Sequence, residues 1–103
     1  MPLTDSNAIR KKLPDRRLCE TLSFEFDSHR YITSFSHFPG TTKLAEIFLD
    51  SGKPNTMLQI HASDSAVLVS LLLQHGVDLE SIRHSISGPI KTALCLIPDR
   101  RAP

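Results

Sequence analysis

The segment from Leu18 to Phe26 alternates between apolar and polar side chains. A period of two over β-prone residues is typical of a strand that buries one face. The apolar positions of one parity are Leu18, Leu22, Phe24 and Phe26, with Glu20 as the exception. We therefore expect a half-buried β-strand, followed by a tight turn at Asp27-Ser28-His29, because these residue types favour turns.

A second strand is expected from Arg30 to Phe38, because β-branched and aromatic residues recur at alternate positions there. One face carries Tyr31, Thr33 and Phe35, and the other carries Ile32 and Phe38. The pattern leaves open which face is exposed, since a shift of one residue in register exchanges the two.

Pro39-Gly40 predicts a type II turn, because proline fixes φ and glycine adopts a positive φ at low cost. A third strand follows from Lys43 to Leu49, and its apolar side carries Ala45, Ile47 and Leu49. Short connections make consecutive strands antiparallel neighbours, so the three strands are expected to form a meander.

The stretch from Met57 to His75 has no glycine or proline, and Thr56 precedes Gln59 by the three residues of a capping box. We expect one long helix, ended by Gly76 in the left-handed conformation. Its large apolar positions recur at helical spacing and should face the core. They are Met57, Ile60, Val67, Leu68, Leu71 and Leu72. Because residues 66–73 are apolar on nearly all sides, we expect deep burial, and replacing Leu68, Leu71 or Leu72 by alanine should cost ~2–5 kcal/mol each.

A shorter helix is expected from Leu79 to Ser87, with Asp78 as its N-cap and Gly88-Pro89 as its stop. Residues 90–97 fit either another short helix or a strand, and their periodicity does not decide between the two. The expected fold class is α+β, with a three-stranded antiparallel meander packed against one long helix and followed by a short second helix.

A chain of 103 residues is expected to form one domain. We place that domain at residues 17–97, between a flexible basic arm at residues 1–16 and a flexible tail at residues 98–103. The net charge of +1 gives no overall field that would favour nucleic acid or membrane as a partner. The two distant cysteines, Cys19 and Cys95, fit a reducing compartment. No secretory signal and no bilayer-spanning run is present, so we expect a cytoplasmic protein.

The order of short motifs from Glu46 to Gly88 resembles the TSCPD-type module. That module occurs in the C-terminal region of adenosylcobalamin-dependent ribonucleotide reductases and in small stand-alone relatives. The matching pieces are Glu46-Ile47-Phe48, Gly52-Lys53, residues 70–77 (SLLLQHGV) and Leu79-Glu80-Ser81-Ile82. With the preceding strands, the resemblance covers about two-thirds of the chain. Asn55 replaces a glycine of the family's turn, and the Thr-Ser-Cys-Pro-Asp string is absent.

The resemblance implies a connection with ribonucleoside-diphosphate reduction, a reaction that needs a radical cofactor and a reducing cysteine pair. Adenosylcobalamin is the cofactor of the family relatives, but a domain of this size is too small to enclose it. We therefore expect this chain to bind no cofactor and not to be a complete enzyme alone. We assign no catalytic residue, because no nucleophile motif with a recognisable local signature is present.

The loop before the long helix is the first candidate site, for an anion or a nucleotide, with Gly52, Lys53, Asn55 and Thr56 as its residues. A helix N-terminus presents unpaired N–H groups and a partial positive charge, and Lys53 adds a full charge. The alternative, which we favour, is an ordinary strand-to-helix turn, since the spacing of a P-loop is missing.

The basic arm is the second candidate site, for nucleic acid, and carries Arg10, Lys11, Lys12, Arg16 and Arg17. Flexible basic segments bind phosphate backbones by releasing counterions. No aromatic residue interleaves these cations to stack on bases, so we favour a solvated tail.

Histidines and cysteines give no recognisable metal-site spacing, so we expect no metal ion. The histidines are His29, His37, His61, His75 and His84. We expect Cys19 and Cys95 to be small, half-buried apolar residues, because a redox pair would need their Cα atoms within about 7 Å.

Three hypotheses for function follow. The leading one is a non-catalytic accessory or interaction module linked to deoxyribonucleotide supply and DNA synthesis, which forms a homodimer or docks on a larger protein such as a ribonucleotide reductase. The second is a part of a ribonucleoside-diphosphate reductase activity that a partner chain completes. The third is weak nucleic-acid binding through the arm.

Overall fold

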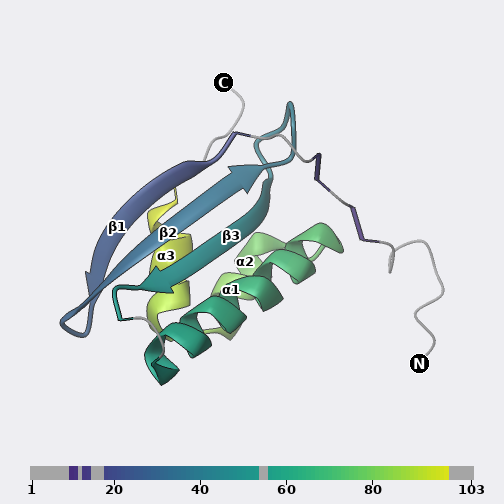
Figure 1. Cartoon of the computed structure of the whole chain (residues 1–103). Coiled ribbons are helices and arrows are strands. Elements are labelled where there is room, and N and C mark those ends of the chain that lie inside the picture. The colour runs from purple at the N-terminus through teal and green to yellow at the C-terminus, as the bar shows by residue number, and fades with distance from the viewer. Residues whose placement is uncertain (1–9, 12, 15–17, 54–55, 98–103) are drawn as a thin grey trace.

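The fold is known from a computed structural model that describes residues 10–11, 13–14, 18–53 and 56–97. Its elements, in chain order, are β1 (Glu20–Phe26), β2 (His29–His37), β3 (Leu44–Ser51), α1 (Met57–Gln74), α2 (Leu79–Ser85) and α3 (Gly88–Leu96). The strands form one antiparallel sheet in the order β1-β2-β3 (Figure 1). The predicted α+β class, with a meander packed against a long helix, is confirmed.

Two tight turns connect the strands as the sequence predicts. Asp27 and Ser28 form a two-residue turn with φ of 52° and 64°, between the paired residues Phe26 and His29. Positive φ at both central residues is the geometry that matches the twist of a β-hairpin. Gly40 has φ of 71°, and the Thr41 N–H donates to the Phe38 carbonyl at 3.0 Å, as a type II turn requires.

The inner face of the sheet carries Tyr31, Thr33 and Phe35 in the middle strand, all almost fully buried. Ile32 points to the outer face and is 48 % exposed, which settles the register that the sequence leaves open. Phe38 is nevertheless buried, but outside the main core cluster, and Lys11 Nζ lies over its ring. The β2–β3 register shifts between Ser36 and His37, with Ala45 as the extra residue in β3.

Helix α1 runs along β3 and covers that edge of the sheet (Figure 1). Ser70 Oγ accepts from the Ile47 N–H at 2.8 Å and donates to the Ile47 carbonyl at 2.9 Å. Gln74 Nε2 donates to the Ala45 carbonyl at 3.1 Å. Side chains of α1 thus satisfy backbone groups that an edge strand would otherwise expose.

Most of the large apolar side chains predicted to form the buried stripe of α1 do not face the core, so that prediction is wrong. Met57, Ile60, Val67, Leu68 and Leu72 are 44 to 62 % exposed. The buried positions are instead Ala62, Ala66, Val69, Leu73 and Gln74. The reason is the position of α1 at the sheet edge, where only a narrow strip of its surface meets protein. Ala62 and Ala66 are small enough to allow the close approach on which the Ser70 contacts depend.

The rest of the inner face is covered by α3, which packs on β1 and against α1. Residues 90–97, left open by the sequence, are therefore helical through Leu96. Gly88-Pro89 was expected to stop α2, but α2 ends at Ser85, and Gly88-Pro89 begins α3. Proline is well suited to the first helical turn, because the N–H that it lacks has no partner there.

The helix ends are set by local hydrogen bonds that the sequence predicts. Thr56 Oγ1 accepts from the Gln59 N–H at 3.2 Å, and Asp78 Oδ2 accepts from the Ser81 N–H at 3.2 Å. Gly76 has φ of 88°, and its N–H donates to the Leu73 carbonyl as the helix ends. These caps confirm the start of α1, its end and the start of α2.

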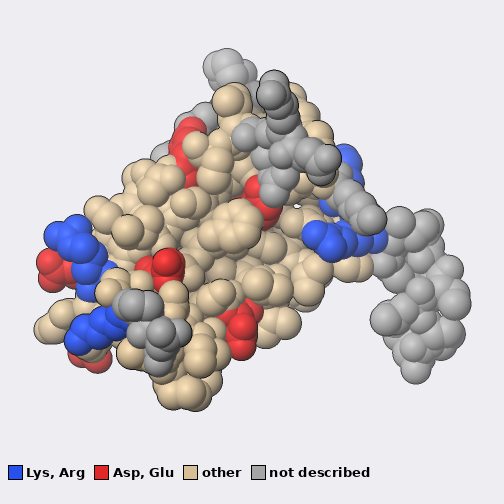
Figure 2. All heavy atoms as spheres, viewed as in Figure 1, with Lys and Arg blue, Asp and Glu red and all other residues tan. Residues whose placement is uncertain are grey.

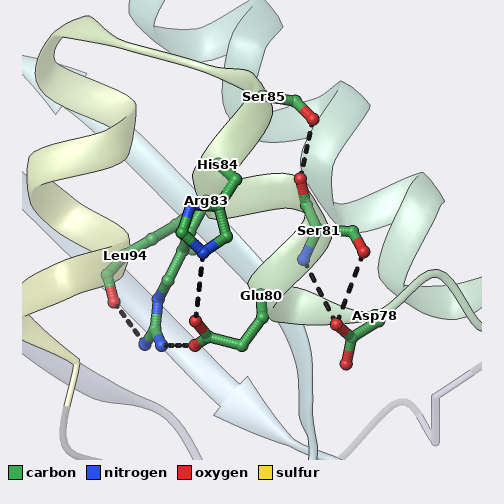
Figure 3. Close-up of polar contacts among 7 residues, drawn as sticks. All are labelled: Asp78, Glu80, Ser81, Arg83, His84, Ser85 and Leu94. Carbon is green, nitrogen blue, oxygen red and sulfur yellow. Dashed lines mark hydrogen bonds and ion pairs between the residues drawn. The ribbon is translucent and has the colours of Figure 1, made fainter.

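Arg83 joins the two short helices (Figure 3). Its Nη1 pairs with Glu80 on α2, and its Nη2 donates to the Leu94 carbonyl of α3 at 2.9 Å. A charged guanidinium with several donors is suited to such bridging between two elements. These contacts hold α2 against α3, the helix that packs on β1.

Most of the predicted arm and the whole predicted tail lie outside the described residues. Within residues 10–11, 13–14, 18–53 and 56–97, no helix combines the length and apolarity needed to cross a membrane.

Candidate interaction surface

An open groove of about 590 Å³ lies between the outer face of the sheet and α1. Its apolar lining comes from Ile32 and Phe48 on the strands and from Ile60 and Val67 on the helix. We call this feature the groove. Most of the core lies on the opposite face of the sheet, and the core residues Leu49 and Ala66 also form part of the groove lining.

Strand register and helix period together explain how these side chains meet. Phe48 pairs with Ser34 and Asp50 pairs with Ile32, so Ile32 and Phe48 lie close together on the outer face. Since α1 runs beside β3, its residues at i, i+3 and i+7 (Ile60, Ser63 and Val67) form the other wall.

The exposed apolar surface continues from the groove along α1. Met57 lies one turn before Ile60, and Leu68 and Leu72 follow Val67. Phe48 is 49 % exposed and Leu68 is 62 % exposed. Together the seven large side chains, which include Ile32, expose apolar area on the order of several hundred Å², as much as the largest patch of a typical monomer.

The groove carries carboxylates but no basic side chain. Asp50 and Asp64 line it, and no Lys, Arg or His lies among its lining residues in the part of the chain that the structure describes. Asp50 Oδ1 accepts from Gln59 Nε2 at 3.0 Å. Figure 2 shows the same face of the molecule, with single carboxylates within a largely uncharged surface and Lys and Arg toward its margins. The groove is therefore apolar with a negative potential.

Residues of the resemblance motif Glu46-Ile47-Phe48 have three different roles beside the groove. Glu46 is 5 % exposed and its Oε2 accepts from Ser36 Oγ at 2.6 Å. Ile47 anchors α1 through Ser70, and Phe48 lines the groove. The motif thus links the position of the helix to the shape of the groove.

The predicted anion loop uses its polar groups to build the turn itself. The Gly52 N–H donates to the Arg30 carbonyl at 3.3 Å, and the Lys53 N–H donates to Ser51 Oγ at 3.3 Å. Thr56 Oγ1 donates to the Lys53 carbonyl at 2.7 Å, while Asn55 lies outside the described residues. Anion binding here stays a prediction without a supporting contact.

Of the predicted basic site, only Arg10 and Lys11 are described. The Lys11 N–H donates to the Gln74 carbonyl at 2.8 Å, and Arg10 Nε donates to Gln74 Oε1. Lys11 Nζ lies 5.0 Å from the centroid of the Phe38 ring. These two residues therefore contact the C-terminal end of α1, while Lys12, Arg16 and Arg17 lie outside the described residues.

The cysteines and histidines form no common site. Cys19 and Cys95 are free and exposed, so the expectation that they are half-buried is wrong. Cys95 is exposed because its neighbours Ala93 and Leu94 occupy the buried side of α3. His75 Nδ1 lies 2.8 Å from the Leu71 carbonyl at the end of α1, as expected for a histidine at a helix C-terminus. Among the described residues, no three His, Cys, Asp or Glu side chains are grouped to hold a metal ion.

The groove was not predicted from the sequence, although the sequence contains a signal for it. Ala62, Ala66 and Ser70 recur every four residues, which marks a face of close approach on a helix. If that row is taken as the buried face, the large side chains of the helix are predicted to point outward. Comparison with known proteins adds no further assignment, because no family model, no curated protein and no solved structure matches the chain.

Proposed function

We propose that this protein is a non-catalytic interaction module that docks on a larger protein through the groove. The observation that carries the proposal is the exposure of Ile32 and Phe48 beside the apolar stripe of α1. Covering apolar area stabilises a complex by roughly 25 cal/mol per Å², before the costs of association are subtracted. The groove is where a partner gains most from contact.

Charge determines the kind of partner that fits. Asp50 and Asp64 oppose an acidic partner and favour one with lysine or arginine beside its apolar side chains. The occupant we propose is an amphipathic, basic segment of the partner, with apolar side chains that fill the space between Phe48 and Val67. An amphipathic helix laid in a groove is a common mode of recognition between proteins.

The resemblance at Glu46–Gly88 supports an adenosylcobalamin-dependent ribonucleotide reductase as the larger protein. In this proposal the partner holds the cofactor and performs the reduction, and this chain supplies a docking surface in the cytoplasm. The module is then linked to deoxyribonucleotide supply for DNA synthesis.

The proposal is tested by titrating such a reductase against fluorescently labelled protein and against the Val67→Lys variant. Val67 lines the groove and is half exposed, so lysine is tolerated by the fold. The new ammonium group disfavours a basic, apolar partner, and we expect Kd to rise at least tenfold, about 1.4 kcal/mol.

The matched control is His84→Lys, an exposed position on α2 that lies outside both the groove and the apolar stripe of α1. We expect it to bind the reductase with a Kd within threefold of the unmodified protein. Failure of the unmodified protein to bind the reductase, or equal loss of affinity in both variants, contradicts the proposal.

A further inference from the structure

The two edges of the sheet differ. The β3 edge is covered by α1 through Ser70 and Gln74. At the other edge, β1 is the outermost strand of the sheet, and no described element covers its outer side (Figure 1). An uncovered edge presents a row of unpaired N–H and C=O groups to any strand that can pair with them.

The hairpin turn determines which backbone groups of β1 point outward. In a two-residue hairpin the residues flanking the turn, Phe26 and His29, form a hydrogen-bonded pair, and such pairs then alternate. Thr21, Ser23 and Glu25 are the intervening residues, so their backbone groups face away from β2. The same alternation in β3 directs the backbone N–H and C=O of Ile47 away from β2. These are the groups that hydrogen-bond to Ser70 of α1.

β1 has few of the features that prevent edge pairing, and its charged residues are Glu20 and Glu25. Its seven residues contain no proline, glycine or lysine, and its register with β2 is regular throughout. The side chains of Thr21 and Ser23, on the outer face of the sheet, are exposed. The side chains of Leu22 and Phe24, on the inner face, are only half buried. A pairing strand would cover both the backbone and these two apolar side chains.

We propose that two copies of this chain pair through β1, antiparallel about a two-fold axis at Ser23, to form a continuous six-stranded sheet. Thr21 of each copy then faces Glu25 of the other, and the two Ser23 residues face each other. These three residue pairs exchange about six backbone hydrogen bonds. Leu22 of each copy lies opposite Phe24 of the other, on the side where α3 packs.

A second copy fits this edge because the strand is complementary to itself. The register places no like charges directly opposite each other, since Glu25 faces threonine and lies 4.0 Å from Arg30 of its own chain. Among the described residues each chain has one uncovered edge, so the assembly closes at two copies and does not extend into a filament. The groove lies at the other side of the sheet and stays available to a partner.

Sedimentation velocity over a range of concentrations tests the proposal on the whole chain. We expect a monomer–dimer equilibrium and, for Ser23→Lys, a dimer Kd raised at least tenfold. The two lysines would oppose each other at the axis, near Arg30, whose Nη1 lies 3.4 Å from Ser23 Oγ. The control is Ser63→Lys, which adds the same charge in the groove and should leave dimerisation unchanged within threefold.

Hydrogen exchange provides a second readout without substitution. The amides of Thr21, Ser23 and Glu25 should exchange rapidly in dilute protein and at least tenfold more slowly at concentrations where the dimer forms. A monomer at every concentration, or a dimer that Ser63→Lys weakens and Ser23→Lys does not, overturns the proposal. These outcomes are independent of reductase binding, which Val67→Lys tests separately.

Discussion

Replacing Ser70 by alanine tests how α1 is held on the sheet. Ser70 Oγ makes two hydrogen bonds with the backbone of Ile47, a residue with no exposed surface. Each buried polar group that loses its partner costs about 1–3 kcal/mol, which gives about 2–4 kcal/mol for a site that is only partly enclosed. Alanine returns up to about 0.7 kcal/mol through its higher helix propensity.

The expected net loss is about 1–3 kcal/mol, a large share of the ~5–15 kcal/mol that stabilises a typical domain. For a domain of this size it lowers Tm by roughly 5–25 °C. Chemical denaturation followed by circular dichroism measures the free energy of unfolding, and Ser63→Ala on the exposed side of α1 measures the propensity gain alone. A Ser70→Ala variant within about 0.5 kcal/mol of the unmodified protein would refute the reasoning that the serine anchors the helix.

Three further predictions concern single side chains. Leu68→Ala should cost less than about 1 kcal/mol in urea denaturation, because this side chain is 62 % exposed, and a loss of 3 kcal/mol would place it in the core. Ser28→Gly should stabilise by about 1 kcal/mol, since Ser28 has φ of 64°, and an unchanged Tm would contradict that. Burial lowers the pKa of His37 from 6.5, so its neutral form is favoured by folding. The associated stability is present above pH 6.5 and is lost as pH falls through the lower pKa of the folded state. Tm measured between pH 7.5 and 5 should therefore fall less in His37→Asn than in the unmodified protein, and parallel profiles would reject this.

Most elements of the fold could be predicted because they have a local signal, whereas residues 90–97, most of α3, were left open. Alternation gives the strands, Pro39-Gly40 gives one turn, and Thr56 and Asp78 give two helix starts. Each signal acts within a few residues, so the tertiary structure has little opportunity to override it. Gly88-Pro89 was misassigned because glycine is typical after one helix and proline is typical within the first turn of the next.

The groove could not be predicted from periodicity because residues 66–73 of α1 are apolar on nearly all sides. When large apolar residues surround a helix, hydrophobicity does not determine which face is buried. The orientation is set instead by Ser70, which needs a partner for its hydroxyl, and by Ala62 and Ala66, which allow contact with β3. These small residues carry little weight in a hydrophobic pattern, although they determine the packing.

The exposure of the large side chains of α1 is the claim on which the proposed docking rests. It is tested most directly by thiol labelling of Leu68→Cys and Val69→Cys, each in a Cys19→Ser and Cys95→Ser background. Leu68 is 62 % exposed and Val69 is 4 % exposed, although they are neighbours in sequence. We predict that the thiol at position 68 reacts at nearly the rate of an unfolded chain, while the thiol at position 69 reacts only as fast as the protein opens. A protected thiol at 68 beside a reactive one at 69 would mean that α1 is turned the other way and that the groove does not exist.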